Sequence, residues 1–288
     1  MASARGAVLI TGASSGIGEA CALRLSGHGF GVFAGVRKES DGAALQQKSA
    51  AIVPVLIDVT NGASITGAAS AVATAVGEAG LAGLVNNAGV AFPGPIEFIE
   101  LNDLRAQLEV NVIGQIAVTQ AFLPLIRKSS GRIVNIGSIA GRAAAPFVGA
   151  YAASKFAMEA LNDSLRQELQ PWGIGVSIVE PGLIATRMLD KGMSTADEAE
   201  RKLPAHAREL YGSAITALRK ATEKAARDAH PADAVARVVE HALTSRRPKT
   251  RYLVGMEAHL QAVIARVIPD RLRDRLYARF MGLHSQSP

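Results

Sequence analysis

Short apolar runs that alternate with longer stretches of helical periodicity constrain the fold of this chain more than any other feature. Each run has the length and the apolar character of a strand buried on both faces. The runs cover residues 7–10, 31–36, 52–57, 83–85, 132–136 and 175–179, and the helical stretches cover residues 62–79, 101–128 and 150–170. This alternation predicts a single doubly wound α/β domain, in which a mostly parallel sheet of about seven strands has helices on both faces.

The composition is that of one large domain in a reducing compartment. The chain has 288 residues, of which 49% are hydrophobic, enough for one sizeable core. Cys21 is the only cysteine, which excludes an internal disulfide framework and favours a cytoplasmic location. The sequence has no signal-peptide pattern and no uninterrupted run of 18 apolar residues, so neither secretion nor a transmembrane helix is expected. The histidines lack metal-ligand spacing, and no metal site is predicted.

A glycine-rich turn follows the first apolar run directly. Residues 11–18 read Thr-Gly-Ala-Ser-Ser-Gly-Ile-Gly, and the helical periodicity after them ends at Gly27 and Gly29. A strand, a glycine turn and a helix in this order bring backbone N–H groups and the positive end of a helix dipole up to a phosphate. The glycine spacing is G-x-x-x-G-x-G, and in this context it predicts the pyrophosphate site of a dinucleotide.

Tyr151 and Lys155 stand one turn apart on a predicted helix, with Ser138 thirteen residues upstream of the tyrosine. A spacing of four places both side chains on one face of the helix. A free phenol has a pKa near ~10, and an ammonium group beside it favours the phenolate. Such a phenol can exchange a proton with a carbonyl or alcohol oxygen while a hydride moves. The same spacing is common among plain surface residues, so the prediction depends on the motifs around it.

Taken together, these motifs resemble the short-chain dehydrogenase/reductase family over residues 7 to about 187. The glycine turn matches the glycine motif of that family, and residues 86–89 (Asn-Asn-Ala-Gly) match its signature after the fourth strand. Its catalytic tetrad matches Asn111, Ser138, Tyr151 and Lys155, and its nicotinamide-binding segment matches Pro181, Gly182 and Thr186. The resemblance implies a Rossmann fold and an NAD(P)-dependent oxidoreductase.

The resemblance also assigns roles to these residues. Tyr151 would act as the acid in reduction and the base in oxidation, and Lys155 would lower its pKa and hold the ribose hydroxyls. Ser138 would bind the substrate oxygen, and Asn111 would hold a water that links Lys155 to solvent. A buried Asn bonded only to backbone is the alternative for Asn111. The cofactor-binding residues that it implies are Gly12, Ser14, Ser15, Gly16, Ile17, Gly18, Arg37, Lys38, Asp58, Val59, Asn87, Ala88, Gly89, Tyr151, Lys155, Pro181, Gly182, Ile184 and Thr186.

The residues after the second strand indicate which dinucleotide is used. Val36 stands where NAD-binding members of the family have an acidic residue, and Arg37 and Lys38 follow it. A guanidinium can hold a 2′-phosphate bidentately, so NADP is expected, with NAD as the alternative. Nearby acidic residues and the absence of a basic residue at Ser15 weaken this expectation. Asp58 would contact the adenine edge, or else cap the helix that begins near residue 60.

The substrate is predicted from the segment that follows the nicotinamide-binding residues. Residues 188–230 are expected to form a helical lid over an apolar pocket. The resemblance is strongest to the retinol, hydroxysteroid and 3-hydroxybutyrate dehydrogenases, which implies a bulky lipophilic alcohol or ketone. A 3-oxoacyl reductase, a 3-hydroxyacid dehydrogenase and a non-catalytic cofactor-binding regulator are the alternatives. The predicted lining residues are Met188, Leu189, Met193, Leu203, Leu210 and Tyr211 from the lid, and Ala91, Phe92, Pro93, Ala143, Ala144, Pro146 and Phe147 opposite.

The region beyond residue 245 is strongly basic. Between Arg246 and Arg279 it has nine Arg and Lys residues against three acidic ones, a net charge of +6 that equals the charge of the whole chain. Residues 259–268 and 272–283 have amphipathic helical patterns separated at Pro269. We therefore divide the chain into a dehydrogenase domain at 1–256 and a basic helical extension at 257–288.

Three interpretations of this extension are open. Its apolar side can pack against its own domain or against a sister subunit, and a homodimer or homotetramer is expected. It can instead lie on an anionic membrane surface as a peripheral contact. Nucleic-acid binding is not expected, because no nucleic-acid-binding module accompanies the charge.

Overall fold

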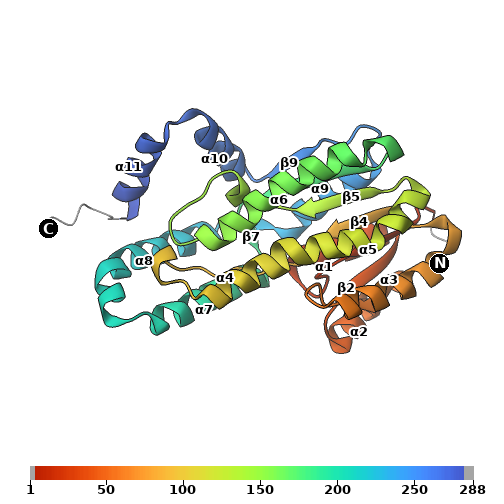
Figure 1. The fold of residues 1–288 in the computed structure, drawn as a ribbon, viewed down its shortest axis with the longest axis horizontal. Coiled ribbons are helices and arrows are strands. Elements are labelled where there is room, and N and C mark those ends of the chain that lie inside the picture. The colour runs from red at the N-terminus through yellow and green to blue at the C-terminus, as the bar shows by residue number, and fades with distance from the viewer. Residues whose placement is uncertain (1–3, 282–288) are drawn as a thin grey trace.

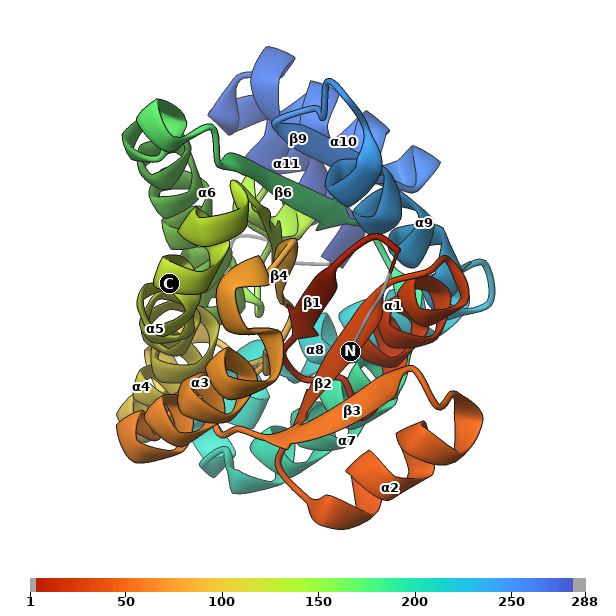
Figure 2. The same cartoon turned by 90° about the vertical axis from the view of Figure 1, so that its right-hand side faces the viewer.

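A parallel sheet forms the centre of the molecule. The computed structural model describes residues 4–281, with the side chains of residues 190–193, 280 and 281 left out. Seven parallel strands lie in the order β3-β2-β1-β4-β5-β6-β9, as Figures 1 and 2 show. This confirms the predicted doubly wound sheet. The strands are β1 (Ala7–Ile10), β2 (Gly31–Val36), β3 (Ile52–Leu56), β4 (Gly83–Asn86), β5 (Arg132–Ile136), β6 (Gly175–Pro181) and β9 (Arg251–Val254).

Helices cover both faces of the sheet (Figure 2). On one face, α1 (Gly16–Gly27) and α9 (Ala232–Thr244) pack against Val8 and Ile10 of β1. On the other face, α3 (Gly62–Val76) and α5 (Gly114–Ser129) pack around Leu9 of the same strand. Alternate residues of one strand therefore enter two separate cores, as the two-residue period of a strand requires. The helices α2 (Glu39–Lys48) and α6 (Gly149–Glu168) complete the two layers.

The predicted helix over residues 101–128 is interrupted by a π-helical turn. It consists of α4 (Leu101–Leu108), the turn η3 (Glu109–Ile113) and α5. π-turns inside α-helices are uncommon and occur often at functional sites, and Asn111 lies in this one. By length and composition this stretch could cross a membrane, because its most apolar 18-residue window has a mean hydropathy of 1.3, and 44% of that window is buried. Val118, Phe122 and Ile126 are fully buried against the sheet, as expected for the core helix of a globular domain.

Four further helices extend beyond the carboxyl ends of the strands. The predicted lid corresponds to α7 (Arg187–Lys202) and α8 (Ala205–Ala226), and a two-stranded sheet of β7 (Ile184–Ala185) and β8 (His230–Pro231) joins the two ends of that segment. The basic extension forms α10 (Met256–Val267) and α11 (Asp270–Met281). In Figure 1 α11 projects over α8, which it contacts. Short helical turns complete the chain: η1 (Gly77–Ala79), η2 (Ile96–Phe98), η4 (Ile139–Gly141) and η5 (Gln170–Trp172).

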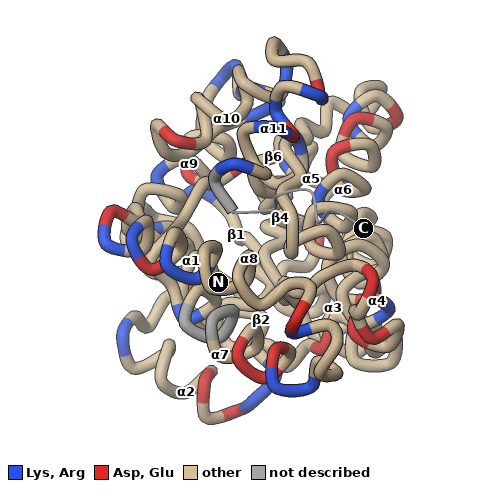
Figure 3. The backbone as a smooth tube through the Cα atoms, turned by 90° about the vertical axis from the view of Figure 1, so that its left-hand side faces the viewer, with Lys and Arg blue, Asp and Glu red and all other residues tan. Residues whose placement is uncertain are grey.

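One side of α11 packs on its own domain, whereas much of α10 does not. Tyr277 of α11 joins an apolar cluster with Phe147, Tyr211 and other residues of α8. On α10 the side chains of Leu260 and Val263 are 61% and 59% exposed. Lys and Arg residues recur along this part of the chain (Figure 3). Only part of the C-terminal extension, chiefly α11, is therefore buried against the dehydrogenase domain of the same chain.

Candidate active site

A cavity of about 1310 Å³ opens at the carboxyl ends of the strands. Asn87 follows β4, Ser138 follows β5 and Gly182 follows β6, and all three line the cavity. Ligands bind at this edge of doubly wound sheets. Tyr151 and Lys155 line the same cavity from α6, and α7 and α8 close its other side. The structure therefore brings the predicted catalytic and nicotinamide-binding segments to one site.

The glycine turn is held by the segment after β4. The hydroxyl of Thr11 accepts hydrogen bonds from the backbone amides of Asn87 and Ala88 at 3.0 and 3.1 Å. The side-chain amide of Asn87 donates to the carbonyl oxygens of Thr11 and Gly12 at 2.9 and 3.0 Å. The carbonyl oxygen of Ala88 in turn accepts from the side-chain amide of Gln115 on α5 at 3.0 Å. The turn is thus fixed before any ligand arrives.

The geometry of this turn leaves room for a pyrophosphate. Gly12 and Gly16 have φ angles of 64° and 59°, a region that favours glycine. A Cβ atom on Gly18 would lie 2.3 Å from the carbonyl oxygen of Gly12, so only glycine fits there. The N-cap of α1, Ser15, makes no side-chain capping bond, which leaves the first N–H groups and the positive helix dipole available to an anion. Ser14 and Ile17 flank this site, and Ile17 lines the cavity.

The residues predicted to distinguish NADP from NAD lie outside the cavity, after β2 and β3. Arg37 and Lys38 are exposed at the end of β2. Two hydrogen bonds from Thr60, at 2.9 Å and 2.7 Å, hold the pKa of the Asp58 carboxyl below its usual value, and the charge of Arg37 acts in the same direction. Arg37 and Asp58 therefore face a common region, which the dinucleotide prediction requires.

The alternative interpretation of Asp58 as a helix cap is wrong. Asn61 is the N-cap of α3, and its side chain accepts from the amide of Ser64 at 2.9 Å. The carboxyl of Asp58 turns back to Thr60 instead, which is the local pattern of an Asx turn. Val59 is buried, and its carbonyl oxygen approaches Gly114 at the start of α5 so closely that a Cβ there would lie 2.6 Å away.

Tyr151, Ser138 and Lys155 lie together at the floor of the cavity. Tyr151 and Ser138 are joined by a side-chain hydrogen bond. Lys155 is buried and donates from Nζ to the carbonyl oxygen of Ile136 at 2.8 Å, and its Nζ lies 5.6 Å from the ring centroid of Tyr151. Ser138 and Ile136 lie on either side of the end of β5, so the end of one strand positions both the hydroxyl and the ammonium.

Burial controls the pKa of both titratable groups. It lowers the pKa of Lys155 from 10.5 to about 8, against the opposing charge of Glu159. It raises the pKa of Tyr151, and the hydrogen bond with Ser138 opposes this in part. The sequence predicted that Lys155 lowers the pKa of Tyr151. The net shift of this pKa is upward, because desolvation of the phenol outweighs the hydrogen bond with Ser138.

Asn111 is buried and does not line the cavity. Its Oδ1 accepts from the amide of Val90 at 2.8 Å, and its Nδ2 donates to the carbonyl oxygen of Val90 at 3.0 Å and to the hydroxyl of Ser154 at 3.1 Å. Ser154 donates in turn to the carbonyl oxygen of Tyr151 at 2.7 Å. The side chain of Asn111 therefore links the segment after Gly89 to the catalytic helix.

The predicted nicotinamide-binding segment leaves β6 and is braced by the C-terminal extension. The amide of Gly182 donates to the carbonyl oxygen of Val254 at 2.9 Å. The amide of Leu183 donates to Oε1 of Glu257 on α10 at 3.3 Å. Pro181, Gly182, Ile184 and Thr186 all line the cavity. Glu257 was not predicted, because no local pattern marks a carboxylate that acts on a loop 74 residues away.

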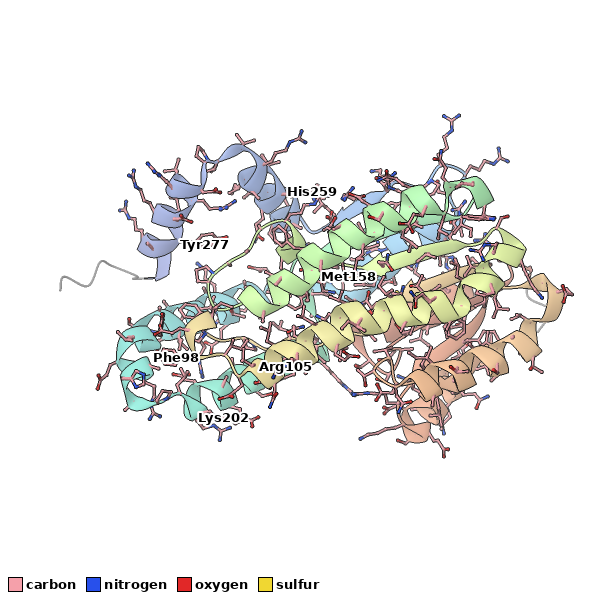
Figure 4. All side chains as sticks on the ribbon, viewed as in Figure 1. Phe98, Arg105, Met158, Lys202, His259 and Tyr277 are labelled. Carbon is pink, nitrogen blue, oxygen red and sulfur yellow. The ribbon has the colours of Figure 1, made fainter. Side chains whose placement is uncertain are left out.

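The lid prediction is correct for part of its lining. Met188, Leu189 and Leu203 line the cavity, whereas Leu210 and Tyr211 do not. Tyr211 instead donates from its hydroxyl to Glu97 at 2.8 Å, and its ring meets Phe98 (Figure 4) edge to face. Met193 lies outside the described side chains. Lining residues that were not predicted include Phe98 of η2, Ile99 directly after it, and Ile215, Leu218, Ala221 and Thr222 of α8.

The opposite wall was also predicted in part. Ala91, Phe92, Pro93 and Phe147 line the cavity. Ala143 does not, and Ala144 and Pro146 border a smaller cavity beside α11. Phe147 has a φ of 66°. The chain therefore turns at this residue, between Pro146 at the smaller cavity and the wall of the main cavity. In the part of the chain that the structure describes, no cluster of His, Cys, Asp and Glu has the geometry of a metal site.

Fold and site together define a doubly wound oxidoreductase of the nicotinamide-dependent kind. The family described as short chain dehydrogenase matches residues 6–197, and the chain belongs to this family. Retinol dehydrogenase 5 of Mus musculus is 40% identical over 287 residues, which cover 97% of this chain and 90% of that protein. The 17-beta-hydroxysteroid dehydrogenase type 6 of Bos taurus is 40% identical over 279 residues, 94% of this chain and 87% of that protein.

Solved structures show the same fold. A short chain dehydrogenase from Burkholderia cenocepacia in complex with NADP matches with a TM-score of 0.70 and 27% identity, over 98% of each chain. A short chain dehydrogenase/reductase from Burkholderia phymatum in complex with NAD matches with a TM-score of 0.73 and 28% identity, over 98% of this chain and 97% of that one. The resemblance expected from the motifs is therefore confirmed, and the chain is an NAD(P)-binding oxidoreductase.

Proposed function

We propose that this protein is an NADP(H)-dependent oxidoreductase that interconverts a bulky lipophilic alcohol and its carbonyl compound. The observation that carries this proposal is the group of Ser138, Tyr151 and Lys155 at the floor of a large cavity with an apolar lid. A retinoid-, steroid- or lipid-like substrate is supported by the two relatives named for retinol and hydroxysteroid oxidation.

The residues of the glycine turn fit a dinucleotide. The close approach at Gly18 and the uncapped start of α1 form a cradle for a pyrophosphate. Arg37 and Lys38 would hold a 2′-phosphate, Asp58 would face the adenine, and Lys155 would hold the ribose hydroxyls. Residues after β4 and β6, including Gly89, Ile184 and Thr186, would flank the nicotinamide. When bound, this group supplies or accepts the hydride.

Tyr151 would transfer the proton at its phenol oxygen. In reduction it donates the proton to the substrate oxygen, and in oxidation it accepts the proton of the alcohol. Ser138 already shares a hydrogen bond with the phenol, so it is placed to donate to the same substrate oxygen as charge develops there. The ammonium of Lys155, 5.6 Å from the phenol ring centroid, favours the phenolate.

Asn111 would serve a proton relay only through its backbone. Its side-chain polar atoms are occupied by Val90 and Ser154, so a relay water would have to bind its main-chain carbonyl oxygen. The side chain positions the catalytic helix through Ser154 and Tyr151. The π-turn places a polar residue in this buried spot without an unpaired atom.

The charges in the cavity argue against an acidic substrate. Besides Lys155, the basic residues that line it are Lys202 and Arg219. Lys202 pairs with Glu198 at 3.0 Å, and Arg219 pairs with both Asp197 and Glu200 at 2.6 Å. No described basic lining residue of the lid is left to bind a carboxylate. A 3-hydroxyacid dehydrogenase or a 3-oxoacyl reductase is therefore supported less well. A non-catalytic regulator would not need the group around Tyr151.

We propose that the exposed apolar face of α10 contacts an anionic membrane surface. Leu260, Val263 and Val267 are 59–70% exposed along one helix, and the basic residues of the region from Arg246 to Arg279 suit anionic lipid. A lipophilic substrate would then reach the cavity, which Gln261 of the same helix lines, from the membrane. The expected homodimer or homotetramer, the cytoplasmic location and the domain boundary at residue 257 stay predictions.

Turnover of a substrate panel tests the proposed function. The purified protein is mixed with NADP or NAD and with retinoid, steroid and long-chain alcohols, or with NADPH or NADH and the matching carbonyl compounds. The nicotinamide absorbance follows the reaction. We expect turnover with lipophilic substrates, faster with the phosphorylated cofactor, and little with 3-hydroxybutyrate. Turnover restricted to 3-hydroxy or 3-oxo acids would support the alternative, and no turnover with any substrate would support a regulator.

A further inference from the structure

Two acidic side chains lie in contact behind the catalytic lysine. Glu159 stands one helical turn after Lys155 on α6, and Glu180 is the penultimate residue of β6. Glu180 has no exposed surface, and the side chain of Glu159 is 13% exposed. Oε1 of Glu180 accepts from Nε of Arg142 at 2.5 Å, and Oε2 of Glu159 accepts from Nε of Arg251 at 3.0 Å. Each carboxyl group therefore uses one oxygen for an arginine.

The second oxygen of each carboxyl group is buried without a donor among the described residues. These atoms are Oε1 of Glu159 and Oε2 of Glu180. The two carboxyl groups are within hydrogen-bonding reach of each other, and burial together with Glu180 raises the pKa of Glu159 to about 7. Two ionised carboxylates in contact repel strongly, whereas one proton between them gives both oxygens a partner.

We propose that Glu159 and Glu180 share one proton as an acid pair, and that this pair is a positioning unit for the catalytic lysine. The shared proton does not depend on the proposed function. Its effect on turnover does rest on the proposed function. The pair carries one negative charge in its protonated form and two after it loses the proton. The charge on Glu159 favours the protonated form of Lys155, so the protonation state of the pair sets how readily the Lys155 and Tyr151 unit releases a proton.

The pair also joins the three segments that supply the site. Glu159 belongs to the helix of Tyr151 and Lys155, Glu180 directly precedes Pro181, and Arg142 ends the turn that begins after Ser138. The contact between the turn and the helix is close. A Cβ on Gly141 would lie 3.0 Å from the carbonyl oxygen of Lys155 and 3.2 Å from Cγ of Glu159. A shared proton keeps these segments together without a repulsive contact at their centre.

The charged residues around Glu159 and Glu180 lie on several elements. From α6 these are Lys155 and Asp163, and Asp163 binds Nη2 of Arg251 at 2.6 Å and Arg166 at 3.3 Å. Arg142 directly follows η4, and Arg251 is the first residue of β9. The helix α10 packs near η4, and its titratable residues there are engaged elsewhere: Glu257 with Leu183 and His230, and His259 with the carbonyl oxygen of Gly255.

Infrared titration tests the shared proton without any need for turnover. The full-length protein is titrated from pH 5.5 to pH 8.5, a range over which ordinary carboxyl groups stay ionised. We expect one protonated carboxyl band that disappears near pH 7, and we expect Glu159→Gln to lack it. Asp163→Asn is the matched control on the same helix and should keep the band. A wild-type spectrum without this band, or a band that persists in Glu159→Gln, overturns the proposal.

The pH dependence of alcohol oxidation tests the positioning role. Glu159→Gln reproduces the hydrogen bonding and charge of the protonated pair, so near pH 6 it should turn over like the wild type. Above pH 7 the wild-type pair gains its second charge and the variant does not. We expect the ascending limb of kcat/KM to lie about one pH unit lower in Glu159→Gln and to be unchanged in Asp163→Asn. An unshifted limb in Glu159→Gln overturns the positioning role. A protein that shows the infrared band but no turnover would instead contradict the proposed function alone.

Discussion

Asn87 donates two hydrogen bonds to Thr11, and these connect the glycine turn to the segment after β4. The amide of Asn87 donates to the Thr11 hydroxyl at 3.0 Å, and the Asn87 side chain donates to the Thr11 carbonyl oxygen at 2.9 Å. The cradle is therefore built from two strand ends that are 76 residues apart in sequence. Such a preorganised turn loses little further entropy when a dinucleotide binds.

Gly18→Ala should disrupt this cradle. A Cβ there would lie 2.3 Å from the Gly12 carbonyl oxygen and 2.5 Å from Nδ2 of Asn87. Relieving such overlap costs about 1–3 kcal/mol, so cofactor affinity measured by fluorescence titration should fall about ten-fold or more. Gly27→Ala, in the same helix, is the control, since nothing lies within 4 Å of its added Cβ. Equal affinities for the two variants would contradict this account of the turn.

Tyr151→Phe should retain the cofactor but lose turnover. The ring still packs, while the hydroxyl that bonds Ser138 is absent. We expect a loss of at least ~10²-fold in kcat, the low end for a positioned acid–base group. Steady-state kinetics and cofactor titration measure the two effects separately. Turnover close to that of the wild type would remove Tyr151 from the mechanism.

The comparison of sequence and structure shows which features are local. Buried strands such as Ala7–Ile10 are recognisable because an apolar run between turns has few other solutions. The seventh strand, Arg251–Val254, was not located, because it begins with an arginine inside a basic region. That arginine binds Glu159 and Asp163 on α6, and only the tertiary fold reveals these partners.

In the candidate site, too, the local features were predicted and those that depend on the tertiary fold were not. The motifs predicted correctly that Ser138, Tyr151 and Lys155 lie together, because Ser138 follows a recognisable strand and the other two stand one turn apart on a recognisable helix. The direction of the pKa shift of Tyr151 was predicted wrongly, since it depends on desolvation by surrounding segments. Glu180 and Glu257 were not singled out, because their roles depend on contacts between segments far apart in sequence.

Arg37→Asp should shift the cofactor preference from NADP toward NAD. The substitution removes a partner of the 2′-phosphate and adds a like charge in its place. A charge-assisted hydrogen bond contributes about 1.5–3 kcal/mol, so the ratio of kcat/KM values for the two cofactors should change about ten-fold or more. Lys48→Asp, at the far end of α2, controls for the general effect of charge. If the wild type prefers NAD, or if both variants behave alike, this interpretation of the turn is wrong.

The burial of Lys155 should make stability depend on pH above neutrality. Its pKa is about 8 in the folded protein and 10.5 ordinarily, so between these values the unfolded chain binds more protons and stability rises with pH. The difference amounts to roughly 3 kcal/mol across the interval. Denaturant unfolding of the wild type and of Lys155→Met at pH 7.5 and pH 10 should show it. The free-energy difference, variant minus wild type, should decrease as the pH rises, and a constant difference would contradict a depressed pKa.

Vesicle binding tests the contact proposed for α10. Truncation after Val254 is a poor test, because Glu257 braces Leu183 and Ala258 is fully buried. The better variants are Leu260→Glu and Val263→Glu, whose side chains are 61% and 59% exposed. Leu56→Glu, at an exposed site on β3, is the matched control.

The wild type and the control should co-sediment with anionic vesicles and not with neutral ones, while the two α10 variants should stay in the supernatant. Because charges are screened over roughly 8–10 Å at physiological salt, added salt should release the bound protein. The mass of each variant in solution decides whether this face of α10 contacts a membrane or a sister subunit. If Leu260→Glu and Val263→Glu convert an oligomer into a monomer, and the wild type does not bind anionic vesicles, then α10 packs against a sister subunit. An apolar helix face beside basic side chains suits the headgroup layer better, because a subunit interface would have to bury those charges against matching acids.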